Sequence, residues 1–477
     1  MQTLLFSLTF LLLFSGCQER GYGTQDIDTI PSVLSTEAPK LLSSTPKSNG
    51  AIAQRAYINV VFNTILDADT VSTKTVQLKS GKTVLDIELT IINNLVYIKP
   101  MESLKDKVNY SLTFSDNITD FFGNALDKPY TLKFHCQTDF WESVEAGQKH
   151  AIAKSKAGDL YMWGSNRKQS LLVDPILYSV DMPFPVAGQD DVQVFSAGTD
   201  TSALINTSNT LITIGNIKLS DPLESVDAVS IGAAHSVLVY DNRTLYSWGS
   251  NESSALGSFN LQGSQSPVQE YSKSENWQSA SAGQNFTLAI QTDGTLWGWG
   301  ANDKGQLAIE LRNELHRPTL IDNRVLRWAS VSSGQQHALA IESNGSLWSW
   351  GNNASGELGH GDNQNSREVK MVKSTQSWKA VSAGTDHSLA LDLNGTLWAW
   401  GSNQSGQLGI DVNSTKNKNT PVKVNGITPS PWISMSAGDR FSLGVKKDGT
   451  LWAWGVNDKG QLGLGQTEDL LIRTEVK

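Results

Sequence analysis

Short runs that alternate apolar and polar residues, each ended by Gly, Asn, Asp or Pro, follow one another from about residue 39 to the end of the chain. Alternation with a period of two is the pattern of a β-strand with one buried face. Between residues 39 and 138 the runs include AYINVVFN, LVYIKP, YSLTFS and YTLKFH. These short strands, bounded by turn residues, predict a small all-β sandwich over 39–138.

From residue 140 to 477 the pattern repeats as a unit. One unit contains a strand WKAVSAG, a strand HSLALD, a turn LNG, a strand TLWAWG, a loop SNQSGQLG and a last strand that opens near Pro421. Aligned on the SAG glycine, the units are spaced 51, 34, 51, 51, 50 and 54 residues apart, at Gly147, Gly198, Gly232, Gly283, Gly334, Gly384 and Gly438. Four short antiparallel strands per unit predict propeller blades, because a lone unit cannot bury both of its faces.

The second unit departs from the others. Its sequence, FSAGTDTSALINTSNTLITIGNIKLSDPL, lacks the Trp-Gly ending and the GQLG loop, and the next SAG-type glycine follows after only 34 residues. We therefore expect a trimmed blade without a projecting outer loop.

Pairs of aromatic residues end the third strand of most units, as in NGTLWAWG at 394–401. Residues two apart share one face of a strand, and neighbouring blades cover both faces of a propeller blade. In the second unit Ile212 and Ile214 replace the pair, and isoleucine fills space but cannot stack flat on a sugar or a base. We therefore predict blade-to-blade core for Trp163, Trp248, Trp297, Trp299, Trp348, Trp350, Trp398, Trp400, Trp452 and Trp454.

Four histidines recur in the motif AGxxH, and they raise the possibility of a metal site. They are His150, His235, His337 and His387. The same position holds Thr201, Phe286 and Phe441 in other units, and no carboxylate or second histidine stands at ligand spacing. We interpret them as structural histidines that bond the adjacent turn backbone, and we expect no metal and no cofactor.

Irregular loops precede each fourth strand, and strand order places them on the same propeller face as the AGxxH turns, opposite the DG turns. Loops on a rigid scaffold are where recognition resides. Their asparagines and glycines, such as Asn302 and Gly305, also look like turn chemistry. The candidate binding-face residues are Asn166, Arg167, Lys168, Asn251, Glu252, Asn302, Asp303, Lys304, Asn353, Asn403, Gln404, Asn457, Asp458 and Lys459.

Composition narrows the functional classes. The chain has 39% apolar residues, 18% charged residues and a net charge of −9, which is typical of a soluble globular protein. It contains no basic run that could neutralise phosphates, so we expect no nucleic-acid partner. G-x-S-x-G, P-loop and H-E-x-x-H motifs are missing, and we expect no enzymatic activity.

The N-terminal sequence is typical of an export signal, because LLFSLTFLLLFSGC contains a short apolar run followed by small residues before Cys17. FSGC resembles the bacterial lipobox, which implies a signal peptide over 1–16, an acylated Cys17 and a polar tether over 17–38. Phe14 stands where the lipobox has Leu, and MQT lacks Lys or Arg, so a plain secretory signal is the alternative. Cys136, the second of two cysteines, is expected to be a small buried hydrophobe.

Two family resemblances follow from these motifs. NYSLTFSDNITDFFGNAL, with Tyr110, Asp120, Gly123 and Asn124, resembles the bacterial Ig-like domain of cell-surface proteins. VSAGTDHSLALDLNGTLWAWGSNQSGQLG resembles the regulator of chromosome condensation repeat, whose seven copies form a seven-bladed β-propeller. The expected fold is all-β: an Ig-like β-sandwich over 39–138 followed by a seven-bladed β-propeller over 140–477.

We expect a lipid-anchored protein of the cell envelope, or otherwise a secreted one, whose monomeric propeller binds a protein partner without catalysis. The family resemblance also implies guanine-nucleotide exchange on a small GTPase as an alternative. A third possibility is an envelope protein that binds or processes polysaccharide, for which exposed Trp side chains would be needed.

Overall fold

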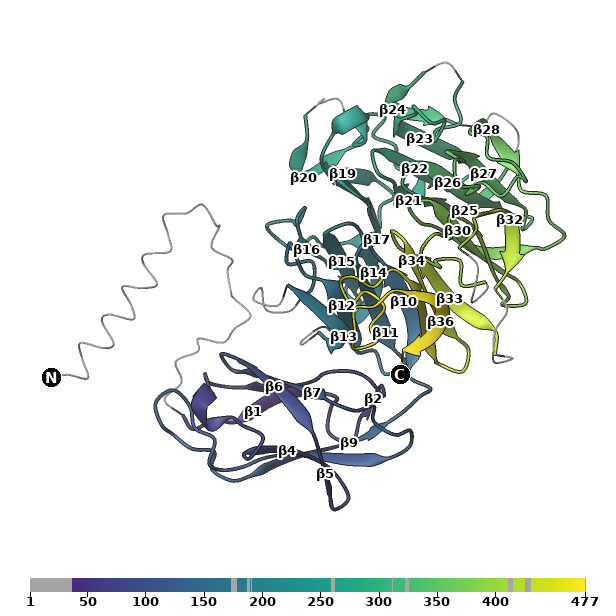
Figure 1. The fold of residues 1–477 in the computed structure, drawn as a ribbon. Coiled ribbons are helices and arrows are strands. Elements are labelled where there is room, and N and C mark those ends of the chain that lie inside the picture. Colours follow the sequence, from purple (N-terminus) through teal and green to yellow (C-terminus); the bar gives the residue numbers. More distant parts are fainter. Residues whose placement is uncertain are drawn as a thin grey trace.

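The computed structural model describes residues 37–172, 178–186, 189, 191–258, 262–310, 312–321, 326–410, 415–424 and 430–476. The expected signal peptide, Cys17 and the expected tether up to residue 36 lie outside these ranges. Within them no helix is long and apolar enough to cross a membrane. Their sheets confirm the predicted fold class, an all-β chain with an N-terminal Ig-like sandwich followed by propeller blades (Figure 1).

The sandwich consists of two facing sheets with the strand orders β1-β3-β7-β6 and β2-β9-β8-β4-β5. Its strands are β1 (Leu41–Thr45), β2 (Ala51–Ile52), β3 (Ile58–Phe62), β4 (Val76–Ser80), β5 (Thr83–Leu85), β6 (Ile87–Ile92), β7 (Leu95–Pro100), β8 (Asn109–Phe114) and β9 (Tyr130–Cys136). A short 3-10 turn, η2 (Ala68–Thr70), follows β3. Alternate residues of both sheets meet inside, where the rings of Phe62 and Phe114 lie 5.5 Å apart. Cys136, at the end of β9, is buried, and burial raises the pKa of its thiol to about 12.

Seven consecutive sheets of the described chain form the propeller. The first three blades are β10 (Trp141–Ala146), β11 (His150–Ser155), β12 (Leu160–Ser165) and β13 (Ser179–Pro185); β14 (Val192–Ala197), β15 (Thr201–Asn206) and β16 (Leu211–Gly215); β17 (Val226–Ile231), β18 (His235–Tyr240), β19 (Leu245–Gly249) and β20 (Ser264–Gln269). The short η3 (Glu252–Ser254) lies before β20.

Blades 4 to 7 each have four strands. They are β21 (Trp277–Ala282), β22 (Phe286–Gln291), β23 (Leu296–Ala301) and β24 (Glu314–Leu320); β25 (Trp328–Ser333), β26 (His337–Glu342), β27 (Leu347–Gly351) and β28 (Ser366–Met371); β29 (Trp378–Ala383), β30 (His387–Asp392), β31 (Leu397–Gly401) and β32 (Lys418–Lys423); β33 (Trp432–Ala437), β34 (Phe441–Lys446), β35 (Leu451–Gly455) and β36 (Leu470–Val476).

Blade 2 is the trimmed blade that its short repeat predicts. Its sheet contains three described strands, and only an isolated bridge between Leu211 and Leu223 occupies the edge where other blades have a fourth strand. The first strands of successive blades contact one another around the central axis.

The ring closes without exchange of strands between blades, a point that the sequence left open. The last strand, β36, pairs with β35 of its own blade through Trp452 and Glu475. Blade 7 then meets blade 1 through side contacts, with the Ala146 amide donating to Ser436 at 2.9 Å.

The sandwich packs against β13 of blade 1 (Figure 1). The Tyr57 amide donates to the Pro183 carbonyl at 3.0 Å, and Lys99 pairs with Asp181 at 3.0 Å. The Tyr97 ring lies 4.5 Å from the ring of Phe184, so one apolar cluster runs from the sandwich into blade 1. The sandwich is therefore fixed to the propeller rather than merely linked to it.

Candidate functional site

One face of the propeller combines two kinds of connection, as the sequence predicts. His387 pairs with Gly401, and His337 with Gly351, so the turn before each second strand lies beside the loop after each third strand. We call this the loop face, and the opposite side, with the DG turns, the turn face. Gly401 has a φ of +98°, and a Cβ there would lie 2.6 Å from the Asp386 carbonyl, so only glycine allows the chain to leave the strand here.

The loop asparagines are not binding residues of this face, which corrects the prediction. They are almost fully buried, and each Oδ1 accepts the backbone N–H of the residue five positions later, at 2.8–3.1 Å. These residues are Asn166, Asn251, Asn302, Asn353, Asn403 and Asn457. A buried amide that closes its own loop satisfies backbone groups that would otherwise be unpaired. The asparagines therefore shape the loops.

The second Trp of each pair is fully buried and bonds the loop of the preceding blade. The Trp400 indole Nε1 donates to the Glu357 carbonyl at 2.8 Å, and Trp350 donates to Gln306 at 2.9 Å. Trp163, Trp248, Trp299 and Trp454 make the equivalent bond. The sequence pattern suggested that only apolar volume mattered here. The indole N–H adds a directional contact, which Ile214 of blade 2 lacks.

The first Trp of each pair lies nearer the turn face and is less enclosed than predicted. Trp297, Trp348 and Trp398 are half-buried, whereas Trp452 is buried. The three half-buried rings pack beside the leading Trp of their blade, as the 5.9 Å between the rings of Trp398 and Trp378 illustrates. Each indole donates to a nearby turn residue, Asp392 in the case of Trp398, so its polar edge stays close to water.

The four AGxxH histidines link neighbouring blades. This corrects the prediction that they bond the backbone of the adjacent turn. His337 Nε2 lies 3.1 Å from the Ser388 hydroxyl, which itself donates to the Glu357 carbonyl at 2.8 Å. Since that hydroxyl gives its proton to the carbonyl, Nε2 must be the protonated ring nitrogen. His150, His235 and His387 make equivalent contacts to Ser202, Thr287 and Ser442. Burial lowers the pKa of His150, His235 and His337 to about 4 and that of His387 to about 3.

The exposed parts of the loop face are the loop tips between these buried anchors. Arg167, Lys168, Glu252, Asp303, Gln404 and Asp458 are exposed, and Lys304 and Lys459 are half-buried. Lys459 pairs with Asp458 at 2.9 Å. The structure thus leaves eight of the predicted residues available to a partner, and all eight are charged or polar.

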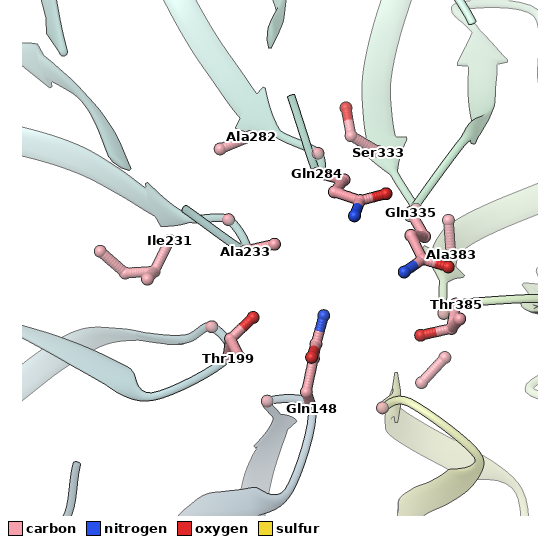
Figure 2. Close-up of a pocket in the computed structure, with 18 of the residues that line it drawn as sticks. Gln148, Thr199, Ile231, Ala233, Ala282, Gln284, Ser333, Gln335, Ala383 and Thr385 are labelled. Carbon is pink, nitrogen blue, oxygen red and sulfur yellow. The ribbon is translucent and has the colours of Figure 1, made fainter. Parts of the chain in front are cut away.

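A shallow funnel of about 100 Å³ opens at the centre of the loop face. The AGxxH turns of all seven blades line it, and polar side chains from Gln148, Thr199, Gln284, Gln335 and Thr385 gather around its mouth (Figure 2). Its glycines interlock: a Cβ on Gly198 would lie 2.4 Å from the Gly232 carbonyl. Sequence reasoning missed the funnel, although the aligned residues after each SAG glycine are its lining.

The funnel offers hydrogen bonds but no nucleophile paired with a base. Within the described ranges, no three His, Cys, Asp or Glu side chains gather in a way that could hold a metal ion. The funnel is therefore a rigid frame of glycine turns that presents polar groups.

Comparison with known families assigns both parts of the chain. Residues 216–477 match the model of the RCC1-like domain, and residues 35–136 match that of the bacterial Ig-like domain. The ultraviolet-B receptor UVR8 of Arabidopsis thaliana is 30% identical over 261 residues, which cover 54% of this chain and 59% of that receptor. The human regulator of chromosome condensation is 25% identical over 367 residues, covering 68% of this chain and 74% of that protein.

A solved structure supports the same fold. The crystal structure of Prp20p from Saccharomyces cerevisiae matches with a TM-score of 0.60 and 18% identity, over 71% of this chain and 88% of that one. The chain thus shares a propeller fold with that protein, and it spans little more than half of the Arabidopsis receptor.

Proposed function

The chain belongs to the RCC1-like domain family, and from that premise we propose that its propeller is a non-catalytic protein-binding scaffold of a bacterial cell envelope. The observation that supports this proposal best is the construction of the loop face. Buried asparagine, tryptophan and histidine contacts fix the loops, while the tips that they present are exposed and polar. A surface held in one conformation loses little entropy when it binds.

The envelope location rests on the N-terminal sequence and on the bacterial Ig-like domain, whose presence hints at a surface protein. The turn at 120–124 adds a structural argument. Asp120 accepts the amides of Phe122 and Asn124, and it holds Phe121 and Phe122 64% and 50% exposed. A short, rigid apolar tip of this kind suits a membrane interface.

The chain enters the sandwich at the same end as this tip. The Asn63 amide donates to the Lys40 carbonyl, and the Phe121 amide donates to the Ile65 carbonyl, each at 3.0 Å. An anchor on Cys17 would therefore be attached at the end of the sandwich that carries the two phenylalanines.

The alternatives draw less support from the structure. None of the 15 Trp side chains, all within the described ranges, is exposed, so the stacking surface that polysaccharide binding would use is not provided by tryptophan. Guanine-nucleotide exchange stays a hypothesis from the family resemblance alone.

Site-specific photo-cross-linking tests the proposed face. A photoreactive residue at Gln404 or Asp458 reports on the loop face, and one at Asn394 or Asp448 is the matched exposed control on the turn face. We expect a discrete cross-linked protein in envelope fractions from the first pair only. Equal cross-linking from both faces would contradict the proposal.

The anchor has its own test. Replacement of Cys17 by Ala removes the acylated thiol, so the protein should move from the membrane to the soluble fraction after export. Unchanged partitioning between the two fractions would overturn the anchor.

A further inference from the structure

The inner edge of the propeller carries a ring of serines around the axis. The fifth residue of the first strand is Ser in six blades, and its hydroxyl accepts a backbone N–H from the next blade. The distances from the donating N to the accepting Oγ are 2.9–3.1 Å. The donor and acceptor pairs are Ile231 and Ser196, Ala282 and Ser230, Ser333 and Ser281, Ala383 and Ser332, Ala437 and Ser382, and Ala146 and Ser436. The first strands are innermost, so these hydroxyls surround the central axis.

Blade 1 breaks this pattern with Glu145. Its Oε2 accepts a hydrogen bond from the Ser436 hydroxyl at 3.0 Å. No Lys, Arg or His of the described chain forms an ion pair with it, and burial raises the pKa of its carboxyl to about 7. A carboxylate that is enclosed by protein without a cation is costly unless something else neutralises it.

Glu145 is next in the chain to the funnel lining. The next residue, Ala146, lines the funnel, and so does Ala437, which follows the hydrogen-bonding partner Ser436. Glu145 is half-buried, so part of its surface remains open to a ligand. The small funnel volume of about 100 Å³ suits a slender chain and not a ring.

The AGxxH turns around the funnel carry three acidic and two basic residues, none of which is part of the funnel lining. Asp200, Asp386 and Asp439 occupy the AGxxH turns, where Lys149 and Arg440 are the bases. Asp386 Oδ1 is buried with no hydrogen-bond partner among the described residues, while Asp439 lies 3.9 Å from Arg440. The polar side chains around the mouth are amides and hydroxyls that can accept hydrogen bonds from an N–H donor.

We propose that this funnel receives a lysine side chain of the partner protein, with the ammonium group facing Glu145 and the alkyl stem filling the opening. This inference rests on the proposed function, because it names the chemistry of the partner that the loop face binds. Glu145 acts as the counter-ion. Gln148, Gln284 and Gln335, which line the funnel, supply side-chain carbonyls that accept hydrogen bonds from the ammonium group as it enters.

Calorimetric titration of the full-length protein with n-butylammonium chloride tests the site, with tetramethylammonium chloride at equal ionic strength as the control. We expect saturable binding of butylammonium only. Glu145→Ser should weaken it at least tenfold. This variant installs the residue that six blades already carry, so it should fold, and Glu145→Gln provides a second neutral variant. Equal binding by wild type and both variants, or no saturable binding by the wild type, overturns the proposal.

Binding should strengthen from pH 6 to pH 8, because Glu145 ionises in this window. The other ionisable groups on the elements and turns packed against β10 include Asp139, Glu142, Lys149, His150, Lys154, Lys156, Asp200, Asp439, Arg440, Lys446, Lys447 and Asp448. His150 is neutral throughout, and aspartate, lysine and arginine normally keep one charge between these values. A binding constant that does not change with pH contradicts the assignment of Glu145.

Cross-linking distinguishes a lysine of the partner protein from a free amine as the source of the ammonium group. Glu145→Ser should reduce by at least tenfold the product that a photoreactive residue at Gln404 forms with the partner. If butylammonium binding is lost but cross-linking is unchanged, the partner assignment is overturned and a free amine is the ligand. If butylammonium does not bind while cross-linking stays specific to the loop face, this inference fails and the proposed function stands. n-Butylguanidinium distinguishes arginine from lysine, and tighter binding than that of butylammonium would overturn the lysine assignment.

Discussion

Two junctions between blades differ in how they are held. Between blades 5 and 6, Trp400 donates to the Glu357 carbonyl, His337 reaches the same carbonyl through Ser388, and the Ser332 hydroxyl accepts the Ala383 amide. Between blades 1 and 2, Ile214 replaces the tryptophan and Glu145 replaces the serine, while His150 and Ser202 remain.

The difference shows that a junction consists of separable contacts. The histidine contact survives where the other two are lost, so it does not depend on them. The blade with the fewest regular contacts to its successor also carries the half-buried carboxylate, which accepts its hydrogen bond from Ser436 of blade 7. We infer that this junction gives up stability where an axial charge is available for binding.

The largest expected effect is the loss of a core tryptophan at the regular junction. Trp400→Ala should lower the free energy of unfolding by about 4 kcal/mol, because it leaves a cavity and removes the bond to Glu357. Ile214→Ala, at the irregular junction, should cost about 2 kcal/mol. Urea unfolding followed by circular dichroism measures both. Equal losses would show that the two junctions are equivalent.

Acidification should weaken both junctions through the contact that they share. The pKa of His150 and His337 is about 4 in the folded protein against 6.5 for an ordinary histidine, so the unfolded chain binds more protons between these values. Stability is therefore fully present above pH 6.5 and is lost as the pH falls to 4, by about 3 kcal/mol per histidine. His337→Gln and His150→Gln should each reduce this loss by the same amount in urea titrations at pH 7, 5.5 and 4. Unequal changes would mean that the histidine contact depends on its neighbours.

Glu145→Ser should make the irregular junction resemble the regular one. The carboxyl pKa is about 7 in the folded protein against 4.5 ordinarily, so the folded state binds more protons and stability falls as the pH rises from 4.5 through 7. The variant should therefore be more stable than the wild type by about 3 kcal/mol at pH 8 and similar to it at pH 4.5. Thermal unfolding at the two pH values measures the difference. A gain confined to pH 4.5 would contradict the electrostatic account.

The smallest expected loss of stability comes from removing the indole N–H alone. Trp400→Phe keeps a buried ring but removes the donor, and Ser388 still donates to the Glu357 carbonyl, so we expect a loss of about 1 kcal/mol. Ile214→Leu, a substitution without a donor to lose, should change stability by less than about 1 kcal/mol. If the phenylalanine variant is as stable as the wild type, the indole bond does not hold the junction.

The sequence alone is sufficient for the architecture, because seven spaced SAG-type glycines and one short unit specify the blades. The contacts between blades are harder to predict. Asn403 looks like an exposed loop residue, and only the structure shows that its amide closes the loop from within. The alternation along a strand can be predicted from neighbouring residues, whereas the hydrogen-bond partner of Trp400 belongs to another repeat. One signal was available: the aligned units place Glu145 where six others have serine.

The way in which the ring closes bears on the order in which a gene could encode the blades. Each blade is one continuous stretch of chain, and blade 7 meets blade 1 through the same Trp contact as five other pairs of blades, with Trp163 donating to the Gln461 carbonyl. The chain arrives at blade 1 beside blade 7, where the Phe140 amide donates to Gly449. A circular permutant that began at any blade boundary would specify the same ring, and a duplicated blade could enter the gene as a complete module.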